Sequence, residues 1–97
     1  MNKEQILSLI GLCQKAKKLV SGEAFALEKI KGKQAKLVFL ASDAGFNTNK
    51  RIRDKSAFYE VEVIDIFTTD ELSGAIGKNN RKVIAITDKG FAEKMKQ

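Results

Sequence analysis

The chain has 97 residues, of which 18 are Lys or Arg and 12 are Asp or Glu, so its formal net charge is +6. A chain of this length buries one modest hydrophobic core, and we expect a single domain over residues 1–97. It contains no histidine and one cysteine, Cys13, which excludes an intramolecular disulfide, a zinc site and Ser-His-Asp or Cys-His catalysis. The excess of positive charge favours a polyanionic partner.

The first third of the chain predicts a helix, a short strand and a second helix. Residues 4–16 carry apolar side chains at the i, i+3, i+4, i+7 spacing of one helical face, namely Ile6, Leu9, Ile10 and Cys13. Residues 19–20 form a short apolar step that ends in a Ser-Gly turn, and residues 23–31 repeat the helical spacing before Gly32. We expect Cys13 to be a core residue.

The middle of the chain predicts a buried strand, a basic helix and a second strand. Residues 36–42 are an almost continuous apolar run, which is typical of a central strand covered on both faces. Asn47 or Thr48 is expected to cap a helix that runs through Tyr59. Residues 61–67 alternate in part between apolar and polar side chains, as a strand does.

The last third predicts a short helix, a strand and a final helix. Residues 69–71 (Thr-Asp-Glu) indicate a helix start, and Gly77 indicates its end. Residues 82–87 form the next apolar strand, and Thr87 or Asp88 is expected to start the last helix.

This alternation of helices and strands predicts the fold class. Helices that cross between strands cover both faces of a sheet, so we expect a three-layer α/β/α sandwich with a four-stranded mixed sheet. Parallel strand pairs are expected to dominate, and one antiparallel strand at an edge of the sheet is compatible with this pattern. Most of the six phenylalanines and the single tyrosine should lie in the core, while Phe25 and Phe46 adjoin loops and should be partly exposed.

The basic residues fall into four groups. They are Lys15, Lys17 and Lys18; Lys29, Lys31, Lys33 and Lys36; Lys50, Arg51, Arg53 and Lys55; and Lys78, Arg81 and Lys82. A single group of this kind is typical of a solvated face. Two or more groups at one end of the sheet would form the electropositive surface that RNA phosphates need.

Two turns are candidates for such contacts. Residues 21–24 (Ser-Gly-Glu-Ala) lead from a strand into a helix, where free backbone N–H groups suit a phosphate or a base edge. Ordinary capping of that helix by Ser21 is the alternative interpretation. Residues 77–82 form a polar loop before a buried strand, and their side chains are hydrogen-bonding amides or cations apart from the glycine.

Four segments in order resemble the ribosomal protein L7Ae family, in its bacterial YlxQ-like branch. They are residues 19–23 (LVSGE), 40–44 (LASDA), 75–78 (AIGK) and 85–92 (AITDKGFA). The resemblance covers essentially the full chain. It implies an α/β/α sandwich of about this length that binds and stabilises kink-turn RNA, a sharply bent duplex with sheared G·A pairs. It also implies that the protein is not an enzyme and needs no cofactor.

In the wider family, a G-x-N-E segment at a helix start reads the G·A pairs, and a loop before the last core strand covers looped-out nucleotides. Aligning the glycines matches residues 22–25 (GEAF) to that segment, whereas aligning the glutamates matches residues 20–23 (VSGE). Neither alignment supplies the asparagine. We therefore expect phosphate contacts to maintain RNA affinity, with kink-turn selectivity less secure.

With the resemblance added, we expect base-edge contacts from the helix-start turn and phosphate contacts from the basic groups. The assigned RNA-binding residues are Ser21, Gly22, Glu23, Ala24, Lys29, Lys31, Lys50, Lys78, Asn79, Asn80, Arg81 and Lys82. No catalytic residue, metal ion or cofactor is expected. The expected partner is structured RNA, in particular ribosomal RNA, with association to the ribosome.

The expected location is the cytoplasm, because no apolar run approaches the roughly 20 residues of a membrane span and the first residues do not resemble a signal peptide. We expect a monomer with no membrane partner. Two alternatives remain open. One is a module that docks on a protein of the translation machinery. The other is an enzyme that uses Asp43, Asp65 or Asp88 at strand ends, which requires a raised carboxyl pKa.

Overall fold

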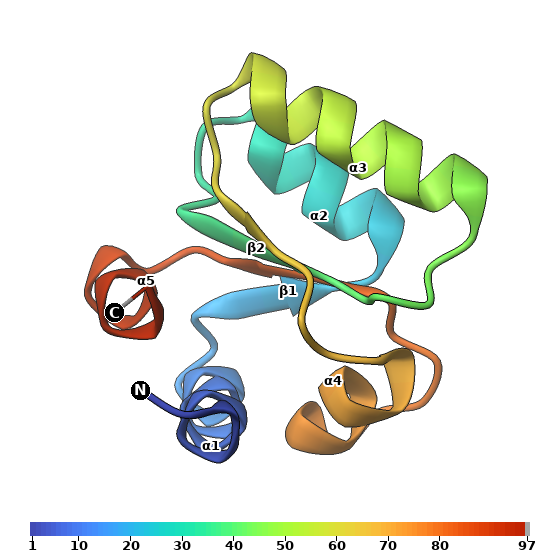
Figure 1. The fold of residues 1–97 in the computed structure, drawn as a ribbon. Coiled ribbons are helices and arrows are strands. Elements are labelled where there is room, and N and C mark those ends of the chain that lie inside the picture. Colours follow the sequence, from blue (N-terminus) through green and yellow to red (C-terminus); the bar gives the residue numbers. More distant parts are fainter. Residues whose placement is uncertain (97) are drawn as a thin grey trace.

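The computed structural model describes residues 1–96 as nine alternating elements. They are α1 (Lys3–Lys15), β1 (Leu19–Ser21), α2 (Glu23–Lys31), β2 (Leu37–Leu40), α3 (Phe46–Phe58), β3 (Val63–Ile64), α4 (Thr69–Ile76), β4 (Val83–Ile86) and α5 (Lys89–Met95). The sheet lies between two helical layers, with α2 and α3 on one face and α1, α4 and α5 on the other (Figure 1). The predicted three-layer sandwich is confirmed.

The four strands form one mixed sheet in the order β1-β4-β2-β3. β2 and β3 are parallel, whereas β4 is antiparallel to both β1 and β2. The expectation that parallel pairs dominate is therefore wrong. β1, β2 and β3 end at the same end of the sheet, which we name the carboxyl end. The opposite end, where β4 finishes, is the amino end.

Hydrogen bonds from α4 explain the direction of β4. The Oδ1 atom of Asp43, just after β2, accepts from the backbone N and the Oγ1 of Thr69 at 2.9 and 2.7 Å. One turn further along α4, the Oγ of Ser73 accepts from the backbone N of Arg81 at 2.8 Å. Because α4 is held at the carboxyl end from both sides, β4 enters the sheet there and runs back toward the amino end.

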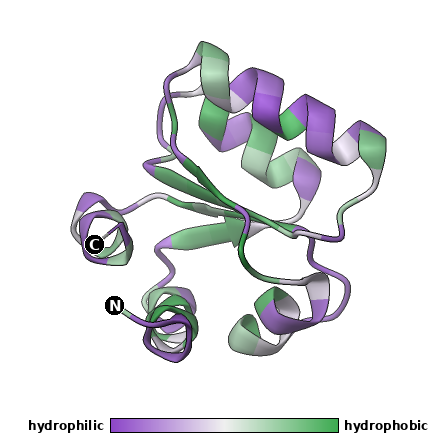
Figure 2. Ribbon diagram, viewed as in Figure 1, coloured by the Kyte–Doolittle hydropathy of each residue, from purple (hydrophilic) through white to green (hydrophobic). Residues whose placement is uncertain are grey.

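The two central strands fill the core on both faces. Leu37 and Phe39 of β2 pack with α1, α4 and α5, while Val38 and Leu40 pack with α2 and α3. All residues of β2 and β4 are buried, and Figure 2 shows both strands as hydrophobic between more polar helices. This confirms that the apolar runs predict central strands, because a side chain on either face of such a strand is covered.

Several element boundaries differ from the predictions. β3 covers two residues, because only Val63 and Ile64 pair with β2. The N-cap of α3 is Gly45 rather than Asn47 or Thr48, and the N-cap of α4 is Thr68, whose hydroxyl accepts from the backbone N of Glu71. Asp88 caps α5 as predicted. Within residues 1–96, no helix is long and apolar enough to cross a membrane.

The aromatic side chains divide between the core and the surface. Among the residues described, the fully buried rings are Phe39 and Phe67, while Phe25, Phe46 and Phe58 are 61%, 79% and 78% exposed. Because α3 buries only Ile52 and Ser56, both phenylalanines at its ends face solvent. Phe91 and Tyr59 are partly buried against the two core clusters. Four of the seven rings therefore lie in or against the core, which confirms the prediction for most of them, and the exposure of Phe25 and Phe46 is confirmed as well.

Cys13 lies in the core as predicted. Burial, reinforced by the charge of Asp88, raises the pKa of its thiol to about 11. Its Sγ is 3.3 Å from the carbonyl oxygen of Lys18, to which the thiol donates. The thiol therefore stays protonated at neutral pH, and Cys13 acts as a small packing residue.

Candidate nucleic-acid interface

Two of the segments singled out in the sequence meet at the carboxyl end of the sheet. The backbone N of Gly22 donates to the carbonyl oxygen of Val83 at 2.8 Å, so the turn between β1 and α2 lies directly beside the loop between α4 and β4. The Nη1 atom of Arg81 donates to Ser21 Oγ at 3.3 Å and lies 3.5 Å from the Ser21 carbonyl oxygen. The structure thus brings the predicted helix-start turn and the predicted polar loop together.

The N-terminus of α2 has no side-chain cap. Gly22 is its N-cap residue, and no side chain accepts a hydrogen bond from its first turn. Capping by Ser21 is therefore wrong, because the Ser21 hydroxyl instead accepts from Arg81. Free N–H groups at a helix start point outward and carry the positive end of the helix dipole. The first turn of α2, including Glu23 and Ala24, is available to an anionic ligand.

The turn depends on glycine at position 22, whose φ is +101° and ψ is 148°. We expect Gly22→Ala to lower the free energy of unfolding by about 1 to 3 kcal/mol, because this backbone region is strained for residues with a Cβ. Steric crowding is not the cause of this loss of stability, since an added Cβ would lie 3.7 Å from the nearest atom, Nη1 of Arg81. Urea unfolding measures the difference.

Gly74→Ala is the matched control, since nothing lies within 4 Å of a Cβ built on Gly74 in α4. This change should stabilise the protein by about 0.5 to 1 kcal/mol. Equal destabilisation by both substitutions would contradict the role of backbone conformation at Gly22.

Glu23 links the starts of α2 and α3. Its carboxylate accepts from the Oγ1 of Thr48 at 2.7 Å and from the Nε of Arg51, with which it also forms an ion pair. The Arg51 hydrogen bond, followed by that of Thr48, lowers the pKa of Glu23 from its ordinary value of 4.5. Glu23 is therefore a fixed anion within a basic region, with acceptor oxygens held near the α2 N-terminus.

This arrangement predicts a pH dependence of stability. The folded-state pKa of Glu23 is depressed, so its stabilising contribution is present above pH 4.5 and is lost as the pH falls through the folded-state pKa. We expect Glu23→Gln to cost about 1 kcal/mol or less at pH 7, and the difference from wild type should shrink with acidification. Urea midpoints measured between neutral and acidic pH test this. Glu28→Gln, which removes a carboxylate at an exposed position of the same helix, is the matched control.

The loop between α4 and β4 presents polar and cationic side chains from a bent backbone. Gly77 ends α4 in the left-handed conformation, with φ +67°, and Asn80 also has a positive φ of 53°. Lys82 Nζ donates to Asn80 Oδ1 at 2.9 Å. Lys78 and Asn79 are exposed. The loop therefore directs both amides and cations outward beside the α2 N-terminus.

The predicted lysines outside this loop divide between the two ends of the sheet. Lys50 lies in the second turn of α3, near the carboxyl end, where its Nζ is 2.8 Å from Asp54 Oδ2. The hydrogen bond to Asp54 raises the pKa of Lys50. Lys29 and Lys31 are in the last turn of α2, roughly 9 and 12 Å along the helix from its start. α2 therefore carries them toward the amino end, away from Gly22, and their assignment to RNA contact stays a prediction.

The structure adds residues that the sequence alone did not assign to this surface. Thr48 and Arg51 bind Glu23, and the exposed rings of Phe25 and Phe46 stand at the first turns of α2 and α3. The exposure of both rings was foreseeable from their neighbouring loops. The contacts of Glu23 connect residues 25 and 28 positions apart, and no local pattern indicates them.

The three aspartates considered for catalysis do not form a cluster. Asp65 is paired with Arg53 at 2.6 Å, and Asp88 caps α5 at the amino end. Asp43 binds Thr69, and the hydrogen bonds from the Thr69 side chain and backbone lower its pKa. An acid catalyst needs the opposite shift. Among residues 1–96, no group of three His, Cys, Asp or Glu side chains could hold a metal ion.

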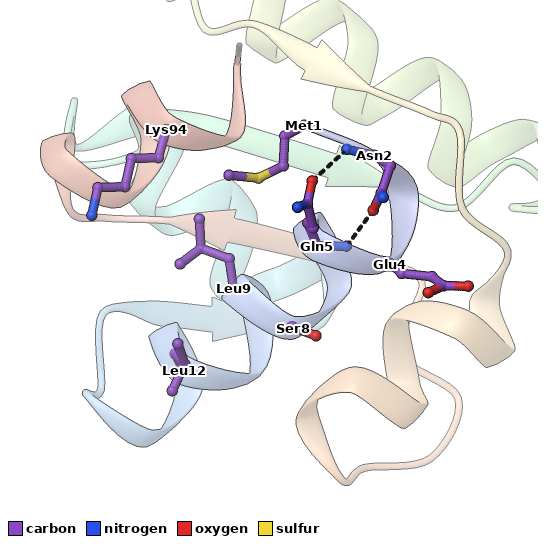
Figure 3. A pocket seen from close by; sticks show the side chains of 8 residues that line it. All are labelled: Met1, Asn2, Glu4, Gln5, Ser8, Leu9, Leu12 and Lys94. Atoms are coloured by element: carbon purple, nitrogen blue, oxygen red, sulfur yellow. Dashed lines mark hydrogen bonds between the residues drawn. The ribbon is translucent and has the colours of Figure 1, made fainter.

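A groove lies elsewhere, between the N-terminal half of α1 and α5 (Figure 3). Leu9, Leu12 and Met1 line it together with short polar side chains and Lys94 of α5. The Asn2 and Gln5 side chains at its rim form the capping box of α1. The groove contains no residue assigned to RNA contact.

Comparisons with known proteins agree in family and fold. A family model described as "Ribosomal protein L7Ae/L30e/S12e/Gadd45 family" matches residues 4–96. The chain is 44% identical over 96 residues to RNA-binding protein YlxQ of Enterococcus faecium, covering 99% of this chain and 92% of the relative. It is 42% identical over 87 residues to RNA-binding protein YlxQ of Bacillus subtilis (strain 168), covering 90% and 87%.

Two solved structures share the architecture. A protein of unknown function from Bacillus halodurans superposes with a TM-score of 0.91 at 38% identity, covering 95% of this chain and 93% of that one. The Giardia lamblia 15.5kD RNA binding protein superposes with a TM-score of 0.85 at 19% identity, covering 98% and 87%. The second likeness shows the fold alone.

Proposed function

The chain belongs to the ribosomal protein L7Ae/L30e/S12e/Gadd45 family, and from that premise we propose that it binds bent, structured RNA of the kink-turn type without catalysing a reaction. Relatives that are 42% and 44% identical over almost the whole chain are named RNA-binding proteins. The proposed setting is the ribosome in the cytoplasm, with the protein acting as a monomer on ribosomal RNA. The proposed surface is the carboxyl end of the sheet.

One observation carries the proposal: the uncapped start of α2 adjoins Arg81 and the polar loop before β4. Phosphate oxygens accept hydrogen bonds from free helix N–H groups, and a guanidinium binds them through two parallel donors. Lys78 and Lys82 add positive charge to the same surface. These contacts would hold an RNA backbone in register without reading its sequence.

Glu23 and the exposed rings supply contacts to bases. The carboxylate of Glu23 stays ionised at neutral pH, since its pKa is lowered, and it can accept hydrogen bonds from base amino groups. The rings of Phe25 and Phe46 are more than half exposed and offer flat faces on which unpaired bases stack. A bent RNA, which exposes both unpaired bases and closely spaced phosphates, fits this combination better than a regular duplex.

The test compares a kink-turn RNA with the same RNA in which Watson–Crick pairs replace the sheared G·A pairs. At near-physiological salt, we expect the intact kink-turn to bind at least about tenfold more tightly, which corresponds to roughly 1.4 kcal/mol. Equal binding of both RNAs would overturn the proposal of structure-specific recognition despite the missing asparagine. The basic surface would then serve association with a protein of the translation machinery.

A further inference from the structure

Lysines also gather at the amino end of the sheet, opposite the proposed interface. They belong to two segments, one from the end of α1 to β1 and the other from the end of α2 to β2. The exposed lysines of these two segments form what we name the lysine patch: Lys15, Lys17, Lys18, Lys31, Lys33 and Lys36. Residues 15–18 and 29–36 contain no acidic side chain. The two segments therefore form a local excess of positive charge.

Backbone hydrogen bonds place the two segments side by side. The backbone N of Thr87 donates to the carbonyl oxygen of Lys18 at 2.9 Å, and the backbone N of Lys36 donates to that of Ile86 at 2.7 Å. Lys18 and Lys36 thus flank the end of β4 on its two sides. Two strand spacings separate them, which is roughly 10 Å.

Both segments are tight turns rather than loose loops. Lys17 and Lys33 have positive φ values of 60° and 61°. The backbone N of Lys18 donates to Cys13 O at 2.9 Å, and that of Gln34 donates to Lys29 O at 2.9 Å, which closes each helix end. The lysine backbones are therefore held in place before any ligand binds.

The lysine patch has the chemistry of a phosphate-binding surface. No ion pair within residues 1–96 involves its members, and Lys36 Nζ makes one long hydrogen bond, 3.5 Å, to the Lys33 carbonyl oxygen. The acidic residues at this end border the patch: Val38 N donates to the carbonyl oxygen of Glu62 at 3.0 Å, so Glu62 lies on the β2 side of the patch, while Asp88 Oδ2 accepts from Phe91 N. The six lysines outnumber these carboxylates. None of the exposed large hydrophobic residues lies in either segment, and the exposed ring at this end of the sheet, Phe58, belongs to α3. The two segments themselves therefore offer ionic contacts rather than base stacking or membrane insertion.

We propose that the lysine patch binds the phosphate backbone of a second RNA segment while the carboxyl end holds the bent RNA. This inference rests on the proposed function. The protein measures 28 × 25 × 21 Å, so an RNA bound at one end brings neighbouring segments of the same RNA within reach of the other. Such tethering raises their effective concentration and makes a few phosphate contacts sufficient. The protein then joins two RNA segments.

The experiment uses two RNAs, a short donor-labelled kink-turn and an acceptor-labelled plain RNA duplex. Energy transfer between them, measured on the full chain as salt is raised, reports the bridged complex. In the variant Lys18→Gln/Lys33→Gln/Lys36→Gln, which changes no residue assigned to kink-turn contact, we expect kink-turn affinity to stay within about twofold and duplex affinity to fall about tenfold or more at low salt. The slope of log affinity against log salt should fall by about 0.9 for each phosphate that the variant no longer neutralises.

A variant with equal net charge, Lys55→Gln/Lys94→Gln/Lys96→Gln, removes three exposed lysines of α3 and of the region around α5. It should retain the bridged complex. An equal loss of duplex affinity in both triple variants would overturn the proposal, and so would the absence of the bridged complex with the wild-type protein. The lysines would then serve to stabilise the C-terminal ends of the helices through the helix dipoles. If the wild-type protein binds no kink-turn RNA, binding of the plain duplex to the Arg81→Gln variant still measures the lysine patch, because this variant lacks the central cation of the other surface.

Discussion

Replacing Arg81 by alanine is expected to lower the affinity for structured RNA by about 10- to 100-fold, or roughly 1.4 to 2.8 kcal/mol. Arg81 is the half-buried cation that connects the β1–α2 turn to the polar loop, through its hydrogen bonds to Ser21. A partly buried guanidinium loses little conformational freedom on binding, and it contacts phosphate through two donors at once. Arginines in such positions dominate binding energies.

The salt dependence separates this effect from a general loss of charge. Arg81→Ala should reduce the slope of log affinity against log salt by about one, and Arg81→Lys should recover only part of the affinity, because lysine lacks the two-pronged geometry. Arg53→Ala is the matched control, since the guanidinium of this α3 residue pairs with Asp65. A loss of affinity in Arg53→Ala equal to that in Arg81→Ala would contradict the assigned interface.

Folding is expected to tolerate the Arg81 change. The substitution removes the hydrogen bonds to Ser21, which is itself half-exposed and can bind water instead. The hydrogen bond from the backbone N of residue 81 to Ser73 Oγ does not need the arginine side chain. Unchanged circular dichroism and a urea midpoint close to that of wild type would therefore accompany the loss of RNA affinity.

The fold could be predicted because its central strands are buried on both faces. β2 and β4 are runs of four apolar residues that are buried at every position, whereas the edge strands β1 and β3 are shorter and partly exposed. Strand direction could not be predicted in the same way. It depends on hydrogen bonds that Thr69 donates to Asp43 and that the backbone N of Arg81 donates to Ser73, and these leave no periodic signal.

The candidate interface could be predicted only in part, because the length of α2 separates side chains that the sequence groups together. The turn at Gly22 and the loop ending in Lys82 adjoin strands that pair with each other, so their proximity follows from the topology. Lys29 and Lys31 share a helix with Glu23, but α2 has nine residues and spans most of the sheet. Membership of one helix does not place charges at one site.

A pair of phenylalanines provides the largest expected stability difference. Phe39→Ala should lower the free energy of unfolding by about 3 to 5 kcal/mol, because the ring is fully buried in β2 and would leave a cavity. Its centroid lies 6.0 Å from that of Phe67. Phe46→Ala removes the same atoms from a ring that is 79% exposed, and its effect should stay within about 0.5 kcal/mol. Urea unfolding followed by circular dichroism measures both.

If Phe39→Ala does not fold, Phe39→Leu gives the graded result, with an expected loss of about 1 to 2 kcal/mol. Comparable losses at positions 39 and 46 would contradict the burial pattern. The same pair then tests the interface, since stacking of one base on an aromatic ring is worth about 1 to 3 kcal/mol. Phe46→Ala should weaken RNA binding and leave the free energy of unfolding unchanged. Phe39→Leu should lower the free energy of unfolding and leave the RNA affinity of the folded protein unchanged. A ring whose removal weakens RNA binding without changing stability acts through its contact with the RNA, because folding does not depend on it.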